Sequence, residues 1–83
     1  MSEKFLIGET ERHIMTVDTN IVSKFITIEV DGRLVIHDWH PSPFAKKFQF
    51  DVGTSETHKV EVRVGPFSAA HVLVDGKPIQ RVV

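Results

Sequence analysis

Histidine and glutamate are the side chains of this sequence with the greatest capacity for chemistry. Five histidines occur among 83 residues, and two of them, His13 and His58, follow a glutamate (Glu11 and Glu56) by two positions. Imidazole and carboxylate groups are zinc ligands, and a chain without cysteine must build any zinc site from them. One hypothesis is therefore a metal site formed by these four residues. Because their spacing matches no recognised ligand pattern, we favour solvated turn residues and expect no metal and no cofactor.

Acid–base catalysis would need a histidine and a carboxylate, or two carboxylates, in one pocket. Asp38 and His40 flank Trp39, and Asp51 lies further along the chain. A two-layer domain this small has little room for a pocket of ~300 Å³ or more. The sequence also contains no Gly-x-Ser-x-Gly motif, phosphate loop or dinucleotide fingerprint. We therefore predict no catalytic residues and expect that the protein is not an enzyme.

An aromatic and proline-rich segment is the best candidate for binding a partner. It contains Trp39, Pro41, Pro43 and Phe44. Aromatic side chains are enriched at protein interfaces because they add contact area at low entropic cost. The alternative is that Trp39 caps one end of the core and Phe44 folds back beneath the loop, because a small domain needs its large apolar side chains for stability.

Length and charge exclude several classes of function. A chain of 83 residues makes one domain, and a net charge of −1 provides no basic excess for nucleic acid. No apolar run approaches the ~18 residues of a membrane span, and no signal peptide is visible. We expect a cytoplasmic protein that binds neither nucleic acid nor membrane.

The apolar pattern predicts an all-β fold. Alternation with period two, rich in β-branched residues, predicts eight short strands near residues 5–7, 14–17, 23–30, 33–39, 47–52, 58–64, 69–74 and 78–83. Asp31-Gly32 and Asp75-Gly76 are typical of two-residue type I′ hairpins. The first hairpin would place Ile28 opposite Val35. Pro78 predicts that the last strand lies at a sheet edge or carries a bulge.

The chain contains two similar halves, residues 4–38 and 49–82. The segment from Phe5 to His13 aligns with that from Phe50 to His58, with identical Phe, Gly, Glu and His. At a spacing shorter by one residue, Val30-Asp31-Gly32-Arg33 aligns with Val74-Asp75-Gly76-Lys77, and Val35 then aligns with Ile79. One four-stranded sheet cannot bury its apolar face alone, whereas two can. The repeat therefore predicts a single domain that is an eight-stranded antiparallel β-sandwich of two four-stranded halves.

The order of these motifs resembles the Fas apoptotic inhibitory molecule family. The resemblance rests on the two Val-Asp-Gly-Lys/Arg hairpins, on Ile36-His37-Asp38-Trp39, and on the segment from Phe48 to Gly53, and it covers about residues 4–80. It implies a β-sandwich like the family's N-terminal domain, no catalytic activity, and a role exerted through protein contacts. The family is associated with restraint of cell death and of protein aggregation under stress. Its animal members carry two such domains in tandem, whereas this sequence holds one.

The sequence thus predicts a non-catalytic domain that binds a protein partner or a second copy of itself. Binding would use the loop containing Trp39 and Phe44, or a sheet edge that pairs with strands of other chains. Two alternatives remain. One is a metal- or ligand-binding domain using His13 and His58, and the other is a structural homodimer subunit.

Overall fold

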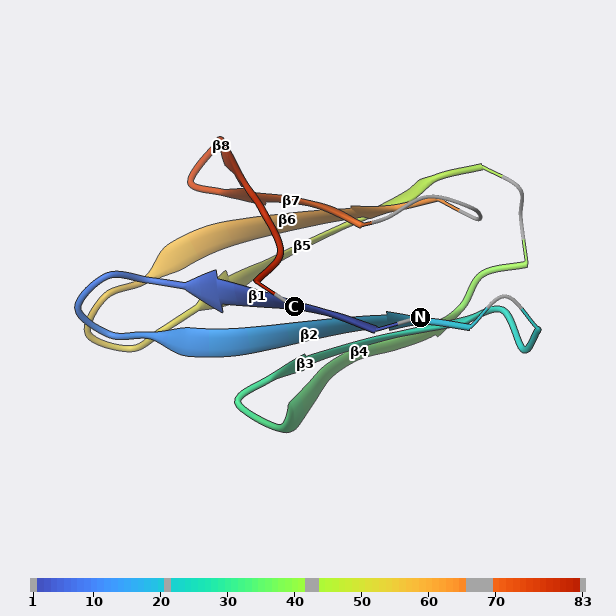
Figure 1. The fold of residues 1–83 in the computed structure, drawn as a ribbon, viewed down its shortest axis with the longest axis horizontal. Coiled ribbons are helices and arrows are strands. Elements are labelled where there is room, and N and C mark those ends of the chain that lie inside the picture. Colours follow the sequence, from blue (N-terminus) through green and yellow to red (C-terminus); the bar gives the residue numbers. More distant parts are fainter. Residues whose placement is uncertain (1, 21, 42–43, 66–69, 83) are drawn as a thin grey trace.

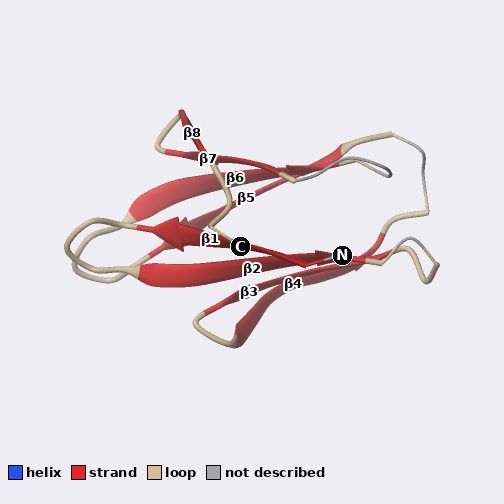
Figure 2. Cartoon of the chain, in the orientation of Figure 1, coloured by secondary structure: helices blue, strands red, loops and turns tan. Residues whose placement is uncertain are grey.

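Eight antiparallel strands form two sheets that pack face to face. The computed structural model describes residues 2–20, 22–41, 44–65 and 70–82, and within these it contains no helix (Figure 2). The first four strands form one sheet and the last four the other, each in sequence order (Figure 1). The strands are β1 (Ser2–Ile7), β2 (His13–Thr19), β3 (Phe25–Val30), β4 (Arg33–Trp39), β5 (Lys46–Val52), β6 (His58–Val64), β7 (His71–Val74) and β8 (Lys77–Ile79). The prediction of an all-β sandwich with eight strands is confirmed.

The two Asp-Gly hairpins have the backbone conformation that their sequences predict. Asp31 and Gly32 have φ values of 52° and 79°, and Asp75 and Gly76 have 52° and 81°. A type I′ turn requires positive φ at both central residues, which aspartate tolerates and glycine adopts without steric cost. These turns connect β3 to β4 and β7 to β8.

The register of β3 against β4 differs from the prediction. Ile28 lies opposite Ile36, not Val35, because a bulge falls between the pairs formed by Ile28 and by Glu29. In the second half, Val72 pairs with Ile79 without such a shift. Ile36, and not Val35, is therefore the counterpart of Ile79. Val35 is the extra residue of the bulge, and the described strands of the second half contain no such shift.

The last strand is shorter than predicted but lies at a sheet edge, as Pro78 indicated. It ends at Ile79, after which the chain crosses to β1 of the other sheet (Figure 1). There the backbone N–H of Val82 donates to the carbonyl of Lys4 at 2.8 Å. The buried carboxylate of Glu3 accepts the N–H of Ala70 at 2.9 Å. The first contact covers the edge of β1, and the second joins the inward face of β1 to the start of the segment that leads into β7.

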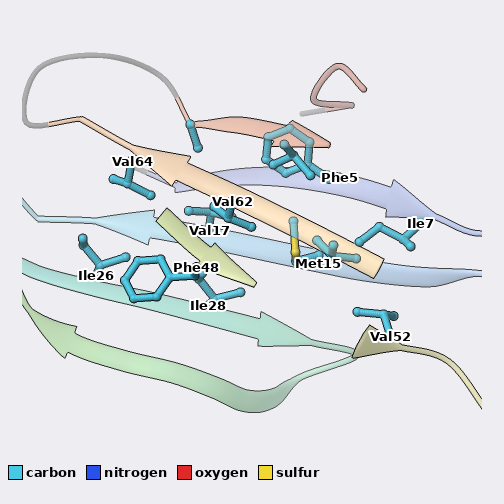
Figure 3. Packing of buried hydrophobic residues seen from close by; sticks show 13 residues of the cluster. Phe5, Ile7, Met15, Val17, Ile26, Ile28, Phe48, Val52, Val62 and Val64 are labelled. Carbon is cyan, nitrogen blue, oxygen red and sulfur yellow. The ribbon is translucent and has the colours of Figure 1, made fainter. Parts of the chain in front are cut away.

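Both sheets contribute to a single apolar core (Figure 3). The inward residues alternate along the strands, so that Ile26 and Ile28 of β3 and Val60, Val62 and Val64 of β6 are buried, as predicted. The core contains Phe5, Ile7, Met15, Val17, Ile26, Ile28, Phe48, Val52, Val60, Val62, Val64, Ala70 and Val72. A four-stranded sheet alone would leave these side chains in water, so the two halves stabilise each other.

Candidate functional site

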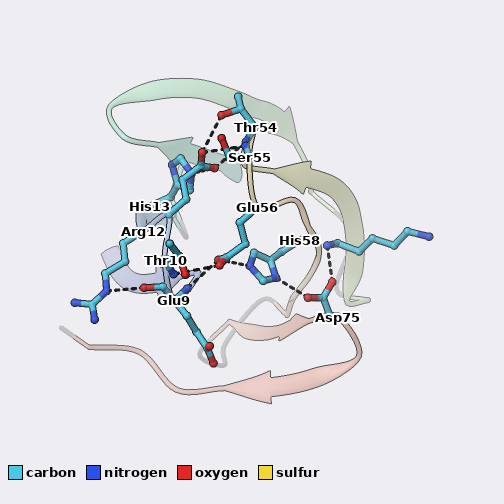
Figure 4. Close-up of polar contacts among 11 residues, drawn as sticks. Glu9, Thr10, Arg12, His13, Thr54, Ser55, Glu56, His58 and Asp75 are labelled. Atoms are coloured by element: carbon cyan, nitrogen blue, oxygen red, sulfur yellow. Dashed lines mark hydrogen bonds and ion pairs between the residues drawn. The ribbon is translucent and has the colours of Figure 1, made fainter.

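Two equivalent hydrogen-bonded triads, each a histidine between two carboxylates, lie at one end of the sandwich. In the first half, His13 Nδ1 lies 2.5 Å from Asp31 Oδ2, and its Nε2 lies 2.9 Å from Glu11 Oε2. In the second half, His58 Nδ1 lies 2.5 Å from Asp75 Oδ2, and its Nε2 lies 2.6 Å from Glu56 (Figure 4). Each imidazole thus has a carboxylate at both ring nitrogens.

The aspartates in these triads belong to the hairpin turns. Asp31 Oδ1 accepts the backbone N–H of Ile14 at 3.0 Å, and Asp75 Oδ1 accepts that of Lys59 at 2.9 Å. Each aspartate therefore supplies positive φ for its hairpin and also ties that hairpin to the start of the neighbouring strand. This double use explains why both hairpins carry aspartate at the same place.

The two glutamates cross from one half to the other. Glu11 accepts the backbone N–H groups of Thr54 and Ser55 at 2.7 and 3.1 Å, and the hydroxyl of Thr54 at 2.8 Å. Glu56 accepts the N–H groups of Glu9 and Thr10 at 2.9 and 3.1 Å (Figure 4). We call residues 8–11 and 53–56 the interlocked turns, because each turn is hydrogen-bonded by the glutamate of the other.

The charges of these groups reinforce one another. Hydrogen bonds to Asp31 and Glu11 raise the pKa of His13, and hydrogen bonds to Glu56 and Asp75 raise that of His58. Hydrogen bonds from His13, Thr54 and Ser55 lower the pKa of Glu11 to about 2. Hydrogen bonds from His58 and from the opposite turn lower that of Glu56 to about 2. Each histidine is therefore stabilised as an imidazolium whose two N–H groups donate to carboxylates.

This arrangement does not form the hypothesised metal site. A histidine ligand must offer a deprotonated ring nitrogen, whereas the ring nitrogens of His13 and His58 are both engaged with carboxylates. Among the described residues, no group of three histidine, aspartate or glutamate side chains is arranged to hold a metal ion. The interpretation as solvated turn residues is also wrong, because the two histidine side chains are only 17% and 18% exposed. Their role here is to join turns.

Of the residues considered for acid–base catalysis, Asp38 and His40 lie within electrostatic range of each other, but each is bound to another group, and Asp51 lies apart from both. Asp38 pairs with the ammonium group of Lys46, which lowers the pKa of Asp38. His40 Nε2 donates to the carbonyl of Phe44 at 2.6 Å. Asp51 is exposed near the far end of β5, opposite Lys59. Asp51 instead lines an open cavity of about 490 Å³ together with Lys59 and Glu61. The expectation that so small a domain has little room for a pocket of ~300 Å³ is therefore wrong.

At the other end of the sandwich, the aromatic residues of the predicted binding segment are exposed. The exposed fractions are 60% for Trp39 at the end of β4 and 76% for Phe44. Pro41 is exposed as well, and Pro43 lies outside the described residues. The alternative, in which Trp39 caps the core and Phe44 folds beneath the loop, is wrong.

Three further exposed apolar side chains, one opposite Trp39 and two at the start of β4, were not identified from the sequence. Phe25 pairs with Trp39 across the strands and stacks on His37, with ring centroids 4.6 Å apart and an interplanar angle of 8°. Leu34 and the bulge residue Val35, at the start of β4, are 63% and 41% exposed. The sequence signal that could have identified Leu34 and Val35 is that two apolar residues stand side by side in a strand that otherwise alternates, so that one of them must face outward. We call Phe25, Leu34, Val35, Trp39 and Phe44 the β4 surface.

No protein family model, curated protein or solved structure matches this chain. The resemblance described above therefore stays a prediction. Within the described residues, the structure contains no helix long and apolar enough to cross a membrane.

The pKa shifts predict greatest stability in mildly acidic solution. Protonated His13 and His58 stabilise the folded state below their ordinary pKa of 6.5, and this contribution is lost as the pH rises through the raised pKa of the folded state. Glu11 and Glu56 contribute above their ordinary pKa of 4.5, and their contribution is lost as the pH falls toward about 2. Urea unfolding over a pH series should therefore give the largest free energy of unfolding between pH 4.5 and 6.5. A His13→Gln, His58→Gln variant should lose most of the decrease on the alkaline side, and an unchanged profile would contradict this assignment.

The interlocked turns also predict an intolerance to alanine at Gly8. Its φ is 97°, and a Cβ would lie 2.0 Å from the carbonyl oxygen of Glu11 and 2.9 Å from Glu56 Oε2. Gly32 is a matched control, because its φ is 79° but a Cβ there would meet nothing within 4 Å. Backbone strain costs about 1–3 kcal/mol at either position, and Gly8→Ala adds a clash that Gly32→Ala does not. Thermal unfolding should show the larger loss for Gly8→Ala, and equal losses would be evidence against the turn geometry.

Proposed function

We propose that this protein is a non-catalytic protein-binding domain that works through the β4 surface. The observation that supports this proposal is the exposure of Trp39 and Phe44, at 60% and 76%, at one end of a small domain. Such a domain would gain stability by burying its largest side chains. Leaving them in water favours a role in binding.

The β4 surface is held in place by contacts that do not use its own side chains. The backbone N–H of His40 donates to the carbonyl of Lys24 at 2.8 Å, and its ring donates to the carbonyl of Phe44. The ion pair of Asp38 with Lys46 joins the end of β4 to the start of β5. A surface that is already ordered loses little conformational entropy when it binds, which favours affinity.

The composition of the β4 surface suits an apolar, extended partner segment. Phe25, Trp39 and Phe44 supply aromatic area, and Leu34 and Val35 add exposed apolar side chains at the start of β4, on the other side of His37. Isolated exposed apolar residues are normal in any protein, but several of them along one strand favour an interaction site. Exposed apolar segments are also what a partially unfolded protein presents. We therefore propose unfolded or stressed proteins as the partners.

This role agrees with the family that the sequence resembles, whose members restrain protein aggregation and cell death. A cytoplasmic location stays the expectation from the sequence. The metal-binding alternative gains no support, because both rings that it would use are saturated by carboxylates.

Light scattering from a heat-stressed model protein tests the proposal. The wild-type domain at an equal molar ratio should suppress the scattering, and a Trp39→Ala, Phe44→Ala variant should suppress it much less. A Leu6→Ala, Ile14→Ala variant is the matched control, because those side chains are 40% and 42% exposed on the same sheet but lie away from β4. The proposal is wrong if the wild type has no effect, or if the variant lacking Trp39 and Phe44 works equally well while folded.

A further inference from the structure

The four sheet edges of this fold are protected to different extents. The edge of β1 is covered by the C-terminal segment through Val82. The edge strand β5 carries Lys46 and Lys47, and β8 has only three residues, one of which is Pro78. Lysines, prolines, short strands and covering segments are the devices by which proteins prevent edges from pairing with other chains.

The edge of β4 has the fewest of these devices. Among the described residues this strand pairs only with β3, and it is seven residues long without lysine or proline. Its protective features are the bulge at Val35 and the inward-facing Asp38, whose charge is paired with Lys46, and the backbone from Ile36 to Trp39 is regular. This part of the strand can accept another strand.

The backbone groups at this edge can be assigned from one hydrogen bond. The N–H of His40 donates to the carbonyl of Lys24, so the backbone of His40 is directed toward the β3 side. Because the hydrogen-bonding direction alternates along an antiparallel strand, His37 and Trp39 direct their N–H and C=O groups away from β3. These groups face the open edge.

We propose that a second copy of this chain pairs through β4, antiparallel and about a twofold axis at His37. The proposal rests on the proposed function in one respect, because both place a binding site on the β4 surface. In this arrangement the two His37 residues exchange backbone hydrogen bonds, and the two four-stranded sheets become one continuous sheet.

The charges and the bulge select this register. An axis at Asp38 would set two carboxylates directly opposite each other, which is destabilising. An axis at Ile36 would set both Leu34 and Val35 of the bulged part opposite the regular part of each strand, whereas an axis at His37 sets only Val35 there. An axis at His37 keeps Ile36, His37 and Asp38 in regular pairing.

The same register also brings apolar side chains together. Trp39 of each copy lies opposite Val35 of the other, which is a favourable aromatic and β-branched cross-strand pair. These side chains are 60% and 41% exposed in the single chain. The paired segment is short, so the interface falls below the ~1,200 Å² of stable complexes and the dimer should be weak, with a dissociation constant on the order of micromolar or higher.

Sedimentation equilibrium of the full chain from ~1 µM to ~1 mM tests the proposal. The wild type should shift from monomer to dimer, and Val35→Lys should lower the association constant by at least about tenfold. Ile14→Lys is the matched control, because Ile14 is 42% exposed on the outer face of the same sheet but lies on the central strand β2. It should dimerise like the wild type.

Amide hydrogen exchange locates the contact. Raising the protein concentration should slow exchange at the His37 and Trp39 amides in the wild type and in Ile14→Lys, but not in folded Val35→Lys. A wild type that stays monomeric at ~1 mM, or a dimer equally strong in Val35→Lys, would overturn the proposal. Suppression of aggregation by a monomeric wild type would still support the proposed function, so the two proposals can fail separately.

Discussion

The reciprocal hydrogen bonding of the interlocked turns is the constraint on which this structure depends. Each half provides a four-stranded sheet with one apolar face, and neither half exchanges a strand with the other. The apolar core holds the sheets together but is not directional. The carboxylates of Glu11 and Glu56 supply direction, because each accepts backbone N–H groups from the turn of the opposite half. They thereby fix how one sheet lies over the other.

The other residues that the two halves share follow from this constraint. His13 and His58 stabilise the charged form of those glutamates, and each histidine is in turn oriented by the aspartate of a hairpin. Gly8 leaves the space through which the backbone of its own turn and the opposite glutamate approach. One end of the sandwich is thus fixed by polar contacts. The other end, where β4 leads toward β5, carries the exposed aromatic residues (Figure 1). Binding there need not disturb the hydrogen bonds between the interlocked turns.

Much of the fold could be predicted from the sequence, because alternation and Asp-Gly turns are local signals. The bulge at Val35 could not, since Leu34, Val35 and Ile36 are all apolar and fit either register. The cross-half bonds of Glu11 and Glu56 join residues more than 40 positions apart. The repeat identified these residues but not their partners. The exposure of Trp39 was undecided, because an aromatic residue suits both a core and an interface.

Hydrogen exchange at the four backbone amides of the interlocked turns tests the central claim most directly. Thr54 and Ser55 donate to Glu11, while Glu9 and Thr10 donate to Glu56. All four amides should be protected near pH 6, although they lie in surface turns, and Glu11→Gln should accelerate exchange chiefly at Thr54 and Ser55. Fast exchange at all four amides in the wild type would contradict the claim that the glutamates lock the two halves together.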